Sequence, residues 1–483
     1  MMRFACVVGS VLVAAAVGAA SPKYVFLFIG DGMSTPQRMM AEEFALATGH
    51  GELTLNHFKN QASLRTCSAS SLVTDSAAAA TALACGTKTQ NGSVGVDKDL
   101  NRLESVAEVA HRKGRKVGIV TTVTINHATP AGFCAHRKHR GLLYQIGLDI
   151  VNTGFDYFAG GGFAGRQNDK KDPFYKGDLL ELAVQNGYVV ATNTPQFRAL
   201  KPGARAFYRG ADGELQYAID ADGTEPTLAE LTQKGVELLD NPAGFFMMIE
   251  GGKLDHAGHA NDAATNLREA LSLDAAVRVA AEFQKKHAEE TLIVVTGDHE
   301  TGGMAMGFAG TGYALYPRRL AAQKCSYEEF PKKVRAAIEA AMKAGRKPSF
   351  TQDLRPLLET WFGFNFTKAD AAASRDAKAG TKFADKNTTA DMDTIYLPKA
   401  DVDVIRDAFK RDVDMLRNAP KRPRFQSGTA AIRIMSAHAG VGWTSGSHTA
   451  LPVLTTSTGV GADAFTGLLD NTEISRRLKA FFE

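Results

Sequence analysis

Short, continuous apolar segments alternate along most of the chain with segments whose apolar positions have helical spacing. The apolar segments are 24–29, 116–122, 245–249 and 292–296, and amphipathic segments such as 103–112 and 263–283 stand between them. Strands that are apolar without alternation are typical of a sheet buried on both faces. We therefore predict an α/β fold, a three-layer sandwich in which a mostly parallel central sheet carries helices on both faces.

Polar residues follow the apolar segments. Asp31 stands just after the first segment, His127 beyond the second, Glu250 after the third, and Asp298 and His299 after the fourth. The carboxyl ends of parallel strands lie at one edge of a sheet, and ligands bind at that edge. We expect these side chains to share one site.

The segment 311–434 has a different pattern. It contains amphipathic helical segments at 332–347 and 401–416, separated by turns with Gly, Asp and Pro, and no apolar segment followed by an acid. We predict that 21–310 and 435–483 form the α/β core. We further predict that 311–434 is a mostly helical, crown-like insertion packed over that core.

Residues 1–20 have the pattern of a secretory signal peptide, with a basic start at Arg3, an apolar run at 4–17 and small residues before Ser21. The run is too short to cross a bilayer comfortably and no other long apolar segment follows, so we predict an exported protein, periplasmic or secreted, without a membrane span. In an oxidising compartment the remaining thiols could pair, and the sequence does not choose among the pairings of Cys67, Cys85, Cys134 and Cys325.

Composition and charge exclude several classes of protein. With 44% hydrophobic and 22% charged residues, the chain is neither wholly disordered nor a multi-span membrane protein. The 56 basic and 52 acidic residues are mixed along the chain and leave a net charge of +4. This small positive excess does not indicate a basic surface that would bind a polyanion, so we predict no nucleic-acid-specific binding.

Several carboxylates and imidazoles have the spacing of metal ligands. Asp298 and His299 are adjacent at a strand end, and Asp255 and His259 are four residues apart, which would place them on one face of a helix. Such ligands without thiolates favour Zn²⁺ or a similar ion over Ca²⁺. Each pair alone could equally be a helix cap or a surface pair. Their gathering at the strand ends of one sheet favours a metal site.

The segment 74–82, TDSAAAATA, contains a candidate nucleophile. Its alanines favour a helix in which Thr74 or Asp75 is the N-cap and Ser76 lies in the first turn. A hydroxyl there faces free N–H groups and the positive end of the helix dipole, where phosphate binds well. The alternative is that Asp75 and Ser76 only cap the helix. Activation of Ser76 would need a histidine brought close by the fold, or a bound metal.

Six stretches of the chain together resemble the alkaline phosphatase family. They are FIGDGMS (28–34), VTDSAAAATALACGTKTQNGSVGVD (73–97), TINHATPAGFCAH (124–136), EGGKLDHAGHAND (250–262), TGDHETGG (296–303) and GWTSGSHTALPV (442–453). The likeness covers 23–310 and 435–483, is most specific around Ser76, and is absent from the insertion. It implies two zinc ions and one magnesium ion around a serine that forms a phosphoserine, in a homodimer.

The resemblance also implies a role for each matching residue. Ser76 would be the nucleophile, and Arg140 would clamp the phosphate and be oriented by Asp75, with Arg137 as the alternative clamp. The zinc ion that activates the attacking water and binds the ester oxygen would be held by Asp255, His259 and His448. The zinc ion that activates Ser76 would be held by Asp31, Asp298 and His299. The magnesium ion would be held by Asp31, Thr129 and Glu250, with waters.

Two histidines depart from the most familiar bacterial pattern of the family. His127 stands where an Asp is usual near the magnesium site, and His256 stands where a Lys is usual beside the phosphate. Histidines at these positions resemble the animal-type members and some other bacterial ones. They remove a carboxylate and a fixed positive charge, so the ion in the third site is left open and phosphate is expected to leave faster.

We therefore predict a metal-dependent hydrolase of small phosphate monoesters with an alkaline pH optimum and a broad substrate range. Two alternatives stay open. One is a related hydrolase of diesters or sulfates, although sulfatases need a C/S-x-P-x-R context, whereas Ala77 follows Ser76 here, and diesterases of this superfamily commonly carry Thr as the nucleophile. The other is a non-catalytic zinc- or phosphate-binding surface protein.

Overall fold

The computed structural model describes residues 21–167, 173–210, 212–308, 310–366, 395–418 and 425–483. The predicted signal peptide, residues 1–20, lies outside the described residues. Residues 367–394 and 419–424 of the predicted insertion also lie outside them.

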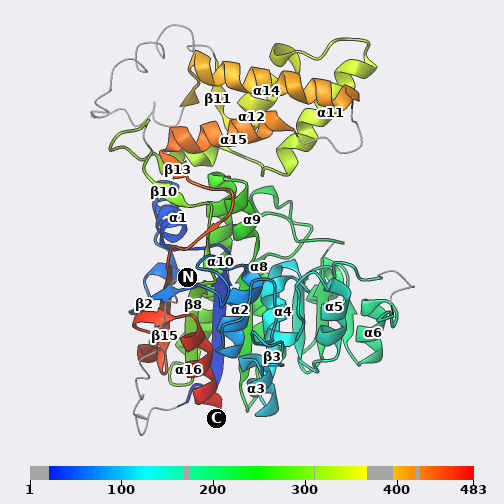
Figure 1. Ribbon diagram of the computed structural model, residues 1–483, viewed down its shortest axis with the longest axis vertical. Coiled ribbons are helices and arrows are strands. Elements are labelled where there is room, and N and C mark those ends of the chain that lie inside the picture. Colours follow the sequence, from blue (N-terminus) through cyan, green and yellow to red (C-terminus); the bar gives the residue numbers. More distant parts are fainter. Residues whose placement is uncertain (1–20, 168–172, 211, 309, 367–394, 419–424) are drawn as a thin grey trace, which may run out of the picture.

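A ten-stranded sheet runs through the larger end of the molecule (Figure 1). Its strand order is β16-β2-β15-β8-β1-β7-β3-β4-β6-β5, and neighbouring strands are parallel except where β15 pairs with β2 and β8. The strands are β1 (Tyr24–Gly30), β2 (Asn60–Arg65), β3 (Lys116–Thr124), β4 (Tyr157–Gly161), β5 (Val189–Ala191), β6 (Ala206–Arg209), β7 (Phe245–Gly251), β8 (Thr291–Gly297), β15 (Val453–Gly459) and β16 (Gly467–Asp470).

Helices cover both faces of this sheet. Side chains of β1 alternate between two apolar clusters, one on each face, so continuous apolar strands are what this position requires. One face packs against α1 (Thr35–Ala47), α7 (Thr194–Arg198), α8 (Leu228–Leu239) and α10 (Ala263–Lys286). The other packs against α2 (Ser76–Cys85), α3 (Val106–Arg112), α4 (Ala128–Cys134), α5 (Leu143–Val151), α6 (Leu179–Gln185) and α16 (Thr472–Phe482). The predicted α/β sandwich is confirmed.

The central strands end in register. Gly30 of β1 lies opposite Gly251 of β7 and Gly297 of β8, so the polar residues after these strands emerge at one edge of the sheet. The turn after β1 requires glycine at residue 32, because its φ is +73° and a Cβ there would lie 2.8 Å from the Asp255 Cα. This close approach brings the turn against α9 (Lys253–His259).

A group of helices stands beyond that edge, at the upper end of Figure 1. Short paired strands, β9 (Glu300–Thr301) with β14 (His448–Thr449) and β10 (Met304–Met306) with β13 (Val441–Trp443), lie between it and the sheet. The helices are α11 (Glu329–Lys343), α12 (Arg355–Phe362), α14 (Lys399–Asn418) and α15 (Gln426–Ala439), with β11 (Phe364–Asn365) paired to β12 (Ile395–Tyr396). The described residues also contain the short 3₁₀-helices η1 (Thr54–Asn56), η2 (Ala218–Asp220), η3 (Pro317–Ala322) and η5 (Ala462–Ala464), and the π-helical segment η4 (Phe350–Leu354).

The structure also bears on the predictions about the cysteines and about membrane-spanning segments. The thiols do not pair: Cys67, Cys85, Cys134 and Cys325 are all free. Burial raises the pKa of the Cys85 thiol to about 12. Within the described part of the chain, no helix is both long enough and apolar enough to cross a membrane.

Candidate functional site

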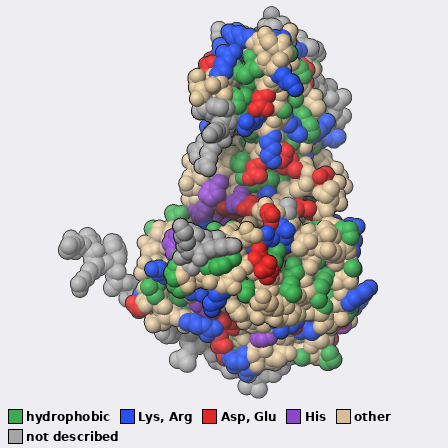
Figure 2. All heavy atoms as spheres, turned by 90° about the vertical axis from the view of Figure 1, so that its right-hand side faces the viewer, with side chains coloured by type: hydrophobic (Ala, Val, Ile, Leu, Met, Phe, Trp, Pro, Cys, Tyr) green, Lys and Arg blue, Asp and Glu red, His purple; other side chains and the backbone are tan. Residues whose placement is uncertain are grey.

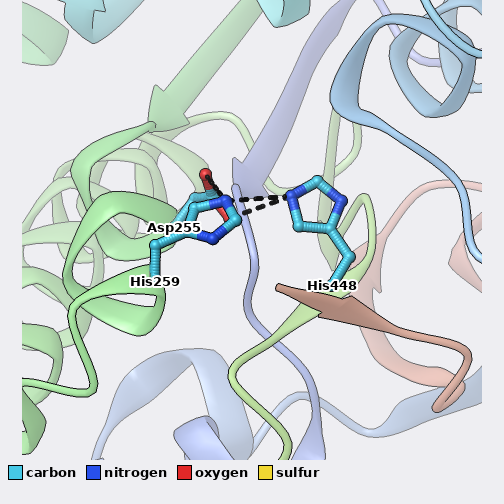
Figure 3. Close-up of side chains that lie close together, drawn as sticks. All are labelled: Asp255, His259 and His448. Carbon is cyan, nitrogen blue, oxygen red and sulfur yellow. Dashed lines mark hydrogen bonds and ion pairs between the residues drawn. The ribbon is translucent and has the colours of Figure 1, made fainter. Parts of the chain in front are cut away.

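Three groups of candidate metal ligands lie together at the carboxyl edge of the central strands. The first consists of Asp255, His259 and His448. Asp255 and His259 are one turn apart on α9, and the His259 Nε2 lies 3.3 Å from the Asp255 Oδ2. His448 comes from β14, and its Nε2 lies 3.2 Å from the His259 Nε2 (Figure 3). The hydrogen bond with Asp255 is the main cause that raises the pKa of His259.

Backbone carbonyl groups orient both imidazoles of this group. The Nδ1 of His448 lies 2.8 Å from the Thr74 carbonyl oxygen, and the Nδ1 of His259 lies 2.8 Å from that of Gly446. Such bonds fix the ring and direct the other nitrogen toward a metal. In both residues it is therefore Nε2 that faces the centre of the group.

The second group lies under the candidate nucleophile. Asp31, Asp298 and His299 are fully buried, and the His299 Nε2 is 3.3 Å from the Asp31 Oδ1 and 3.3 Å from the Asp298 Oδ2. The ligand atoms that lie within reach of one ion here are those of Asp31, Asp255 and His299, so Asp255 is shared with the first group. The predicted ligand Asp298 lies beside this group through its contact with His299. The Ser76 Oγ lies 3.3 Å from the same His299 Nε2.

The third group consists of Asp31, Glu250 and His127, and the Thr129 hydroxyl lies beside it, 3.3 Å from the Asp31 Oδ2. Sequence reasoning missed Thr121, whose hydroxyl donates to the Glu250 Oε2 at 2.5 Å. A signal was present, because Thr121 is a polar residue in a strand and lies opposite Glu250 in the register of β3 and β7.

The carboxylates of these groups fit bound cations. Among the buried oxygens without a hydrogen-bond partner are the Asp31 Oδ1, the Glu250 Oε1 and the Asp298 Oδ2. Burial and then the charges of Asp298, Asp255 and Glu250 raise the pKa of Asp31, and burial raises that of Glu250 to about 7. Clustered buried carboxylates without counter-charges are costly, and metal ions remove that cost.

The candidate nucleophile opens a buried helix. Asp75 is the N-cap of α2, and its side chain accepts a hydrogen bond from the Ala78 N–H at 3.0 Å. Ser76 is the first residue of the helix and is 2% exposed. Asn91, which sequence reasoning missed, holds this turn: its side chain accepts from the Asp75 N–H and donates to the Val73 carbonyl oxygen.

The two candidate arginines are placed differently. Arg140 approaches Asp75, with 3.3 Å between Nη1 and Oδ2, and its Nη2 lies 3.0 Å from the His127 Nε2. Arg137 instead pairs with Asp149. Burial and the charge of Arg140 lower the pKa of His127 to about 3, so this imidazole is neutral.

His256 faces the site from α9 and is held by Glu214, another residue that sequence reasoning missed. Its Nδ1 lies 3.1 Å from the Glu214 Oε2. Burial acts to lower the pKa of His256, but the hydrogen bond with Glu214 and the charges of Glu214 and Asp255 together outweigh it, and the net pKa is raised. Both residues line a cavity of about 960 Å³, and Lys333 and Trp361 of the helical segment line it as well. Figure 2 shows acidic, basic and histidine side chains gathered on the middle of the face that it presents.

The chain belongs to the alkaline phosphatase family, whose sequence profile matches residues 22–154 and 177–483. It is 35% identical over 339 residues to the repressible alkaline phosphatase of Saccharomyces cerevisiae, a match that spans 62% of this chain and 59% of the yeast protein. It is 38% identical over 249 residues to alkaline phosphatase 4 of Bacillus subtilis, across 49% of this chain and 51% of that protein. The chain thus spans little more than half the length of these two relatives.

Solved structures agree with this family. The cold-active alkaline phosphatase of a Shewanella species superposes with a TM-score of 0.76 at 25% identity, covering 95% of this chain and 100% of that one. The Thermus thermophilus alkaline phosphatase gives a TM-score of 0.75 at 26% identity, over 95% of this chain and 91% of that one.

Proposed function

We propose that this protein is a metal-dependent hydrolase of phosphate monoesters that works through a phosphoserine on Ser76. One observation carries the proposal: the Ser76 Oγ lies 3.3 Å from the His299 Nε2, where three groups of candidate ligands meet. Membership of the alkaline phosphatase family supports the same activity.

The ligand groups fit two zinc ions and one magnesium ion. Asp255, His259 and His448 would hold one zinc; Asp31, Asp298 and His299 would hold the other; and Asp31, Thr129 and Glu250 would hold the magnesium. Bound zinc would lower the pKa of the serine hydroxyl and of water and would stabilise charge on the phosphoryl oxygens. His127 lies within the third group and offers an imidazole there, so this group fits zinc as well as magnesium.

The residues of the chain act on the phosphoryl group. The Ser76 Oγ bonds to phosphorus as the bond to the ester oxygen breaks, and water then cleaves the serine–phosphorus bond and releases phosphate. Arg140 grips two phosphoryl oxygens with its guanidinium, and Asp75 keeps that guanidinium in place. His256 and His127 orient the phosphate from the side of the third group.

This arrangement favours an alkaline optimum and a broad range of small monoesters. High pH keeps the serine and the attacking water deprotonated, and all the contacts named above are made to the phosphoryl group rather than to the leaving group. The pattern of residues 1–20 supports export to the periplasm or the medium. Family likeness supports a homodimer, and the separate helical end in Figure 1 supports treating 311–434 as an insertion over a core of 21–310 and 435–483.

The test is hydrolysis of p-nitrophenyl phosphate by the zinc-loaded protein, by the chelated protein and by Ser76→Ala. We expect turnover only in the first, with zinc still bound in the variant. Ser475→Ala is a matched control, because Ser475 is also buried and bonds to α2 at its opposite end, on the Ala84 carbonyl oxygen. Activity that survives both chelation and the loss of Ser76 would refute the mechanism.

A second assay separates this function from diester hydrolysis. Turnover of p-nitrophenyl phosphate and of bis(p-nitrophenyl) phosphate is compared on the same preparation, and we expect the monoester to react faster. Faster cleavage of the diester would overturn the proposal.

A further inference from the structure

Glu300 is a buried carboxylate that belongs to none of the three ligand groups. It opens β9, directly after Asp298 and His299, and it is fully buried. Its charge is met by four neutral hydrogen-bond donors. A buried carboxylate with this many donors is a rigid connection, because each donor would be left unpaired if the carboxylate moved.

The four donors come from three different segments. The Oε1 accepts from the Gln37 Nε2 of α1 at 2.7 Å and from the Met304 N–H at 3.1 Å. The Oε2 accepts from the Gly303 N–H at 3.0 Å and from the Thr449 hydroxyl of β14. The carboxylate therefore ties α1, the turn after β9, and β14 to the strand end that carries His299.

The contact with β14 reaches a candidate zinc ligand. β9 and β14 pair antiparallel, with Thr449 opposite Glu300 and His448 opposite Thr301. His448 is thus the direct neighbour of the residue that Glu300 holds. Its Nδ1 meets the Thr74 carbonyl oxygen at 2.8 Å, so strand pairing and that bond together fix where its Nε2 points.

We propose that Glu300 is a positioning residue for His448, acting through Thr449 and the pairing of β9 with β14. It touches neither substrate nor metal. It sets the affinity of the group Asp255, His259 and His448 for zinc by holding one ligand in place before the ion arrives. The inference rests on the proposed function, since that zinc group is itself proposed.

The sharpest variant is Thr449→Val, which removes the hydroxyl but leaves Glu300 bonded to Gln37, Gly303 and Met304. Thr449→Ser keeps the hydroxyl and is the conservative rescue. Glu300→Gln tests the carboxylate itself. The NH₂ group of the glutamine replaces one carboxylate oxygen and cannot accept the hydrogen bonds that this oxygen accepted. Thr232→Val is the control, since it deletes a hydroxyl that is more deeply buried than the half-buried Thr449 hydroxyl and that bonds within α8, to the Leu228 carbonyl oxygen.

The readout is the zinc dissociation constant, measured by competition with a chromophoric chelator on metal-depleted protein. Loss of a residue that orients a ligand weakens metal binding about 10- to 100-fold. We expect a weakening of this size for one zinc in Thr449→Val and in Glu300→Gln, and near wild-type affinity in Thr449→Ser and Thr232→Val. Excess zinc should restore kcat in Thr449→Val.

Three results would count against the inference or its basis. A lower unfolding temperature of the metal-free variants with unchanged zinc affinity would show a purely structural role and overturn it. An undiminished effect of Thr449→Val in a His448→Ala background would also overturn it, because the coupling must run through His448. Wild-type protein that binds no zinc would instead refute the proposed function. If Glu300→Gln fails to fold, the zinc dissociation constant of Thr449→Val alone tests the inference.

Discussion

Glu269 gives the fold a pH-dependent stability whose sign and size follow from its surroundings. Its side chain lies on α10, is 2% exposed, and accepts a hydrogen bond from the Ala218 N–H at 2.7 Å. Burial is the main cause that raises its pKa from 4.5 to about 7, against the opposing effects of the Ala218 hydrogen bond and of the charge of Lys253. The substitution Glu269→Gln keeps an acceptor for Ala218 and removes the ionisation.

The folded protein therefore holds the Glu269 proton more tightly than the unfolded chain does. The stabilising contribution is fully present below about pH 4.5 and is lost as the pH rises through about 7. A pKa separation of about 2.5 corresponds to about 3 kcal/mol, of which about 2.5 kcal/mol falls between pH 5 and pH 8. Glu269→Gln should gain stability relative to wild type by about that amount more at pH 8 than at pH 5.

Urea unfolding of both proteins at the two pH values measures this difference. Glu108→Gln is the matched control with the opposite sign. Burial acts to raise the pKa of Glu108, but the hydrogen bonds with His136 and the Ser105 N–H and the charges of His136 and Arg102 together outweigh it, and the pKa is lowered. That variant should lose stability relative to wild type as the pH rises from 3 to 6. An equal effect of Glu269→Gln at pH 5 and pH 8 would refute the reasoning.

Three other expectations follow from the geometry. Arg140→Lys should weaken inhibition by inorganic phosphate at least about tenfold, because an ammonium cannot replace a bidentate guanidinium, and unchanged inhibition would contradict its role. Gly303→Ala should cost more than about 2 kcal/mol in urea unfolding, because its φ is +59° and a Cβ would lie 1.8 Å from the Thr444 Oγ1. Gly49→Ala, with φ +80° and no atom within 4 Å, should cost only about 1 kcal/mol. Because the four described cysteines are free, a reductant should leave the unfolding temperature unchanged.

The central sheet was predictable because its strands are buried on both faces and are therefore apolar throughout. The sequence pattern did not reveal β2, where exposed and buried positions are mixed, or the three-residue β5. The antiparallel direction of β15 was also not foreseen, since direction depends on which strands become neighbours. One free thiol has a physical reason: Cys325 lies in the apolar cluster on one face of the sheet, whereas Cys85 and Cys134 lie in the cluster on the other, so the sheet separates Cys325 from both.

The candidate site was predictable where its residues directly follow strands, as Asp31, Glu250 and Asp298 do. Glu214 and Asn91 were missed because each lies in an irregular segment, and only the folded chain brings it to His256 or to the turn before Ser76. The choice between Arg137 and Arg140 needed the same information. The resemblance assigns the clamp to Arg140, with Arg137 three residues earlier as the alternative, and in the structure Arg137 forms an ion pair with Asp149.

The position of β15 has a consequence for how the chain matures during synthesis. This strand, Val453–Gly459, fills the gap between β8 and β2, so β2 has no partner on that side until almost 400 further residues have left the ribosome. Pairing between such distant residues is slow, and the unpaired edge of β8 stays open to other strands meanwhile. His448 emerges immediately before β15. Closure of the sheet and completion of the ligand set are therefore coupled late events, and a truncated nascent chain would gain neither.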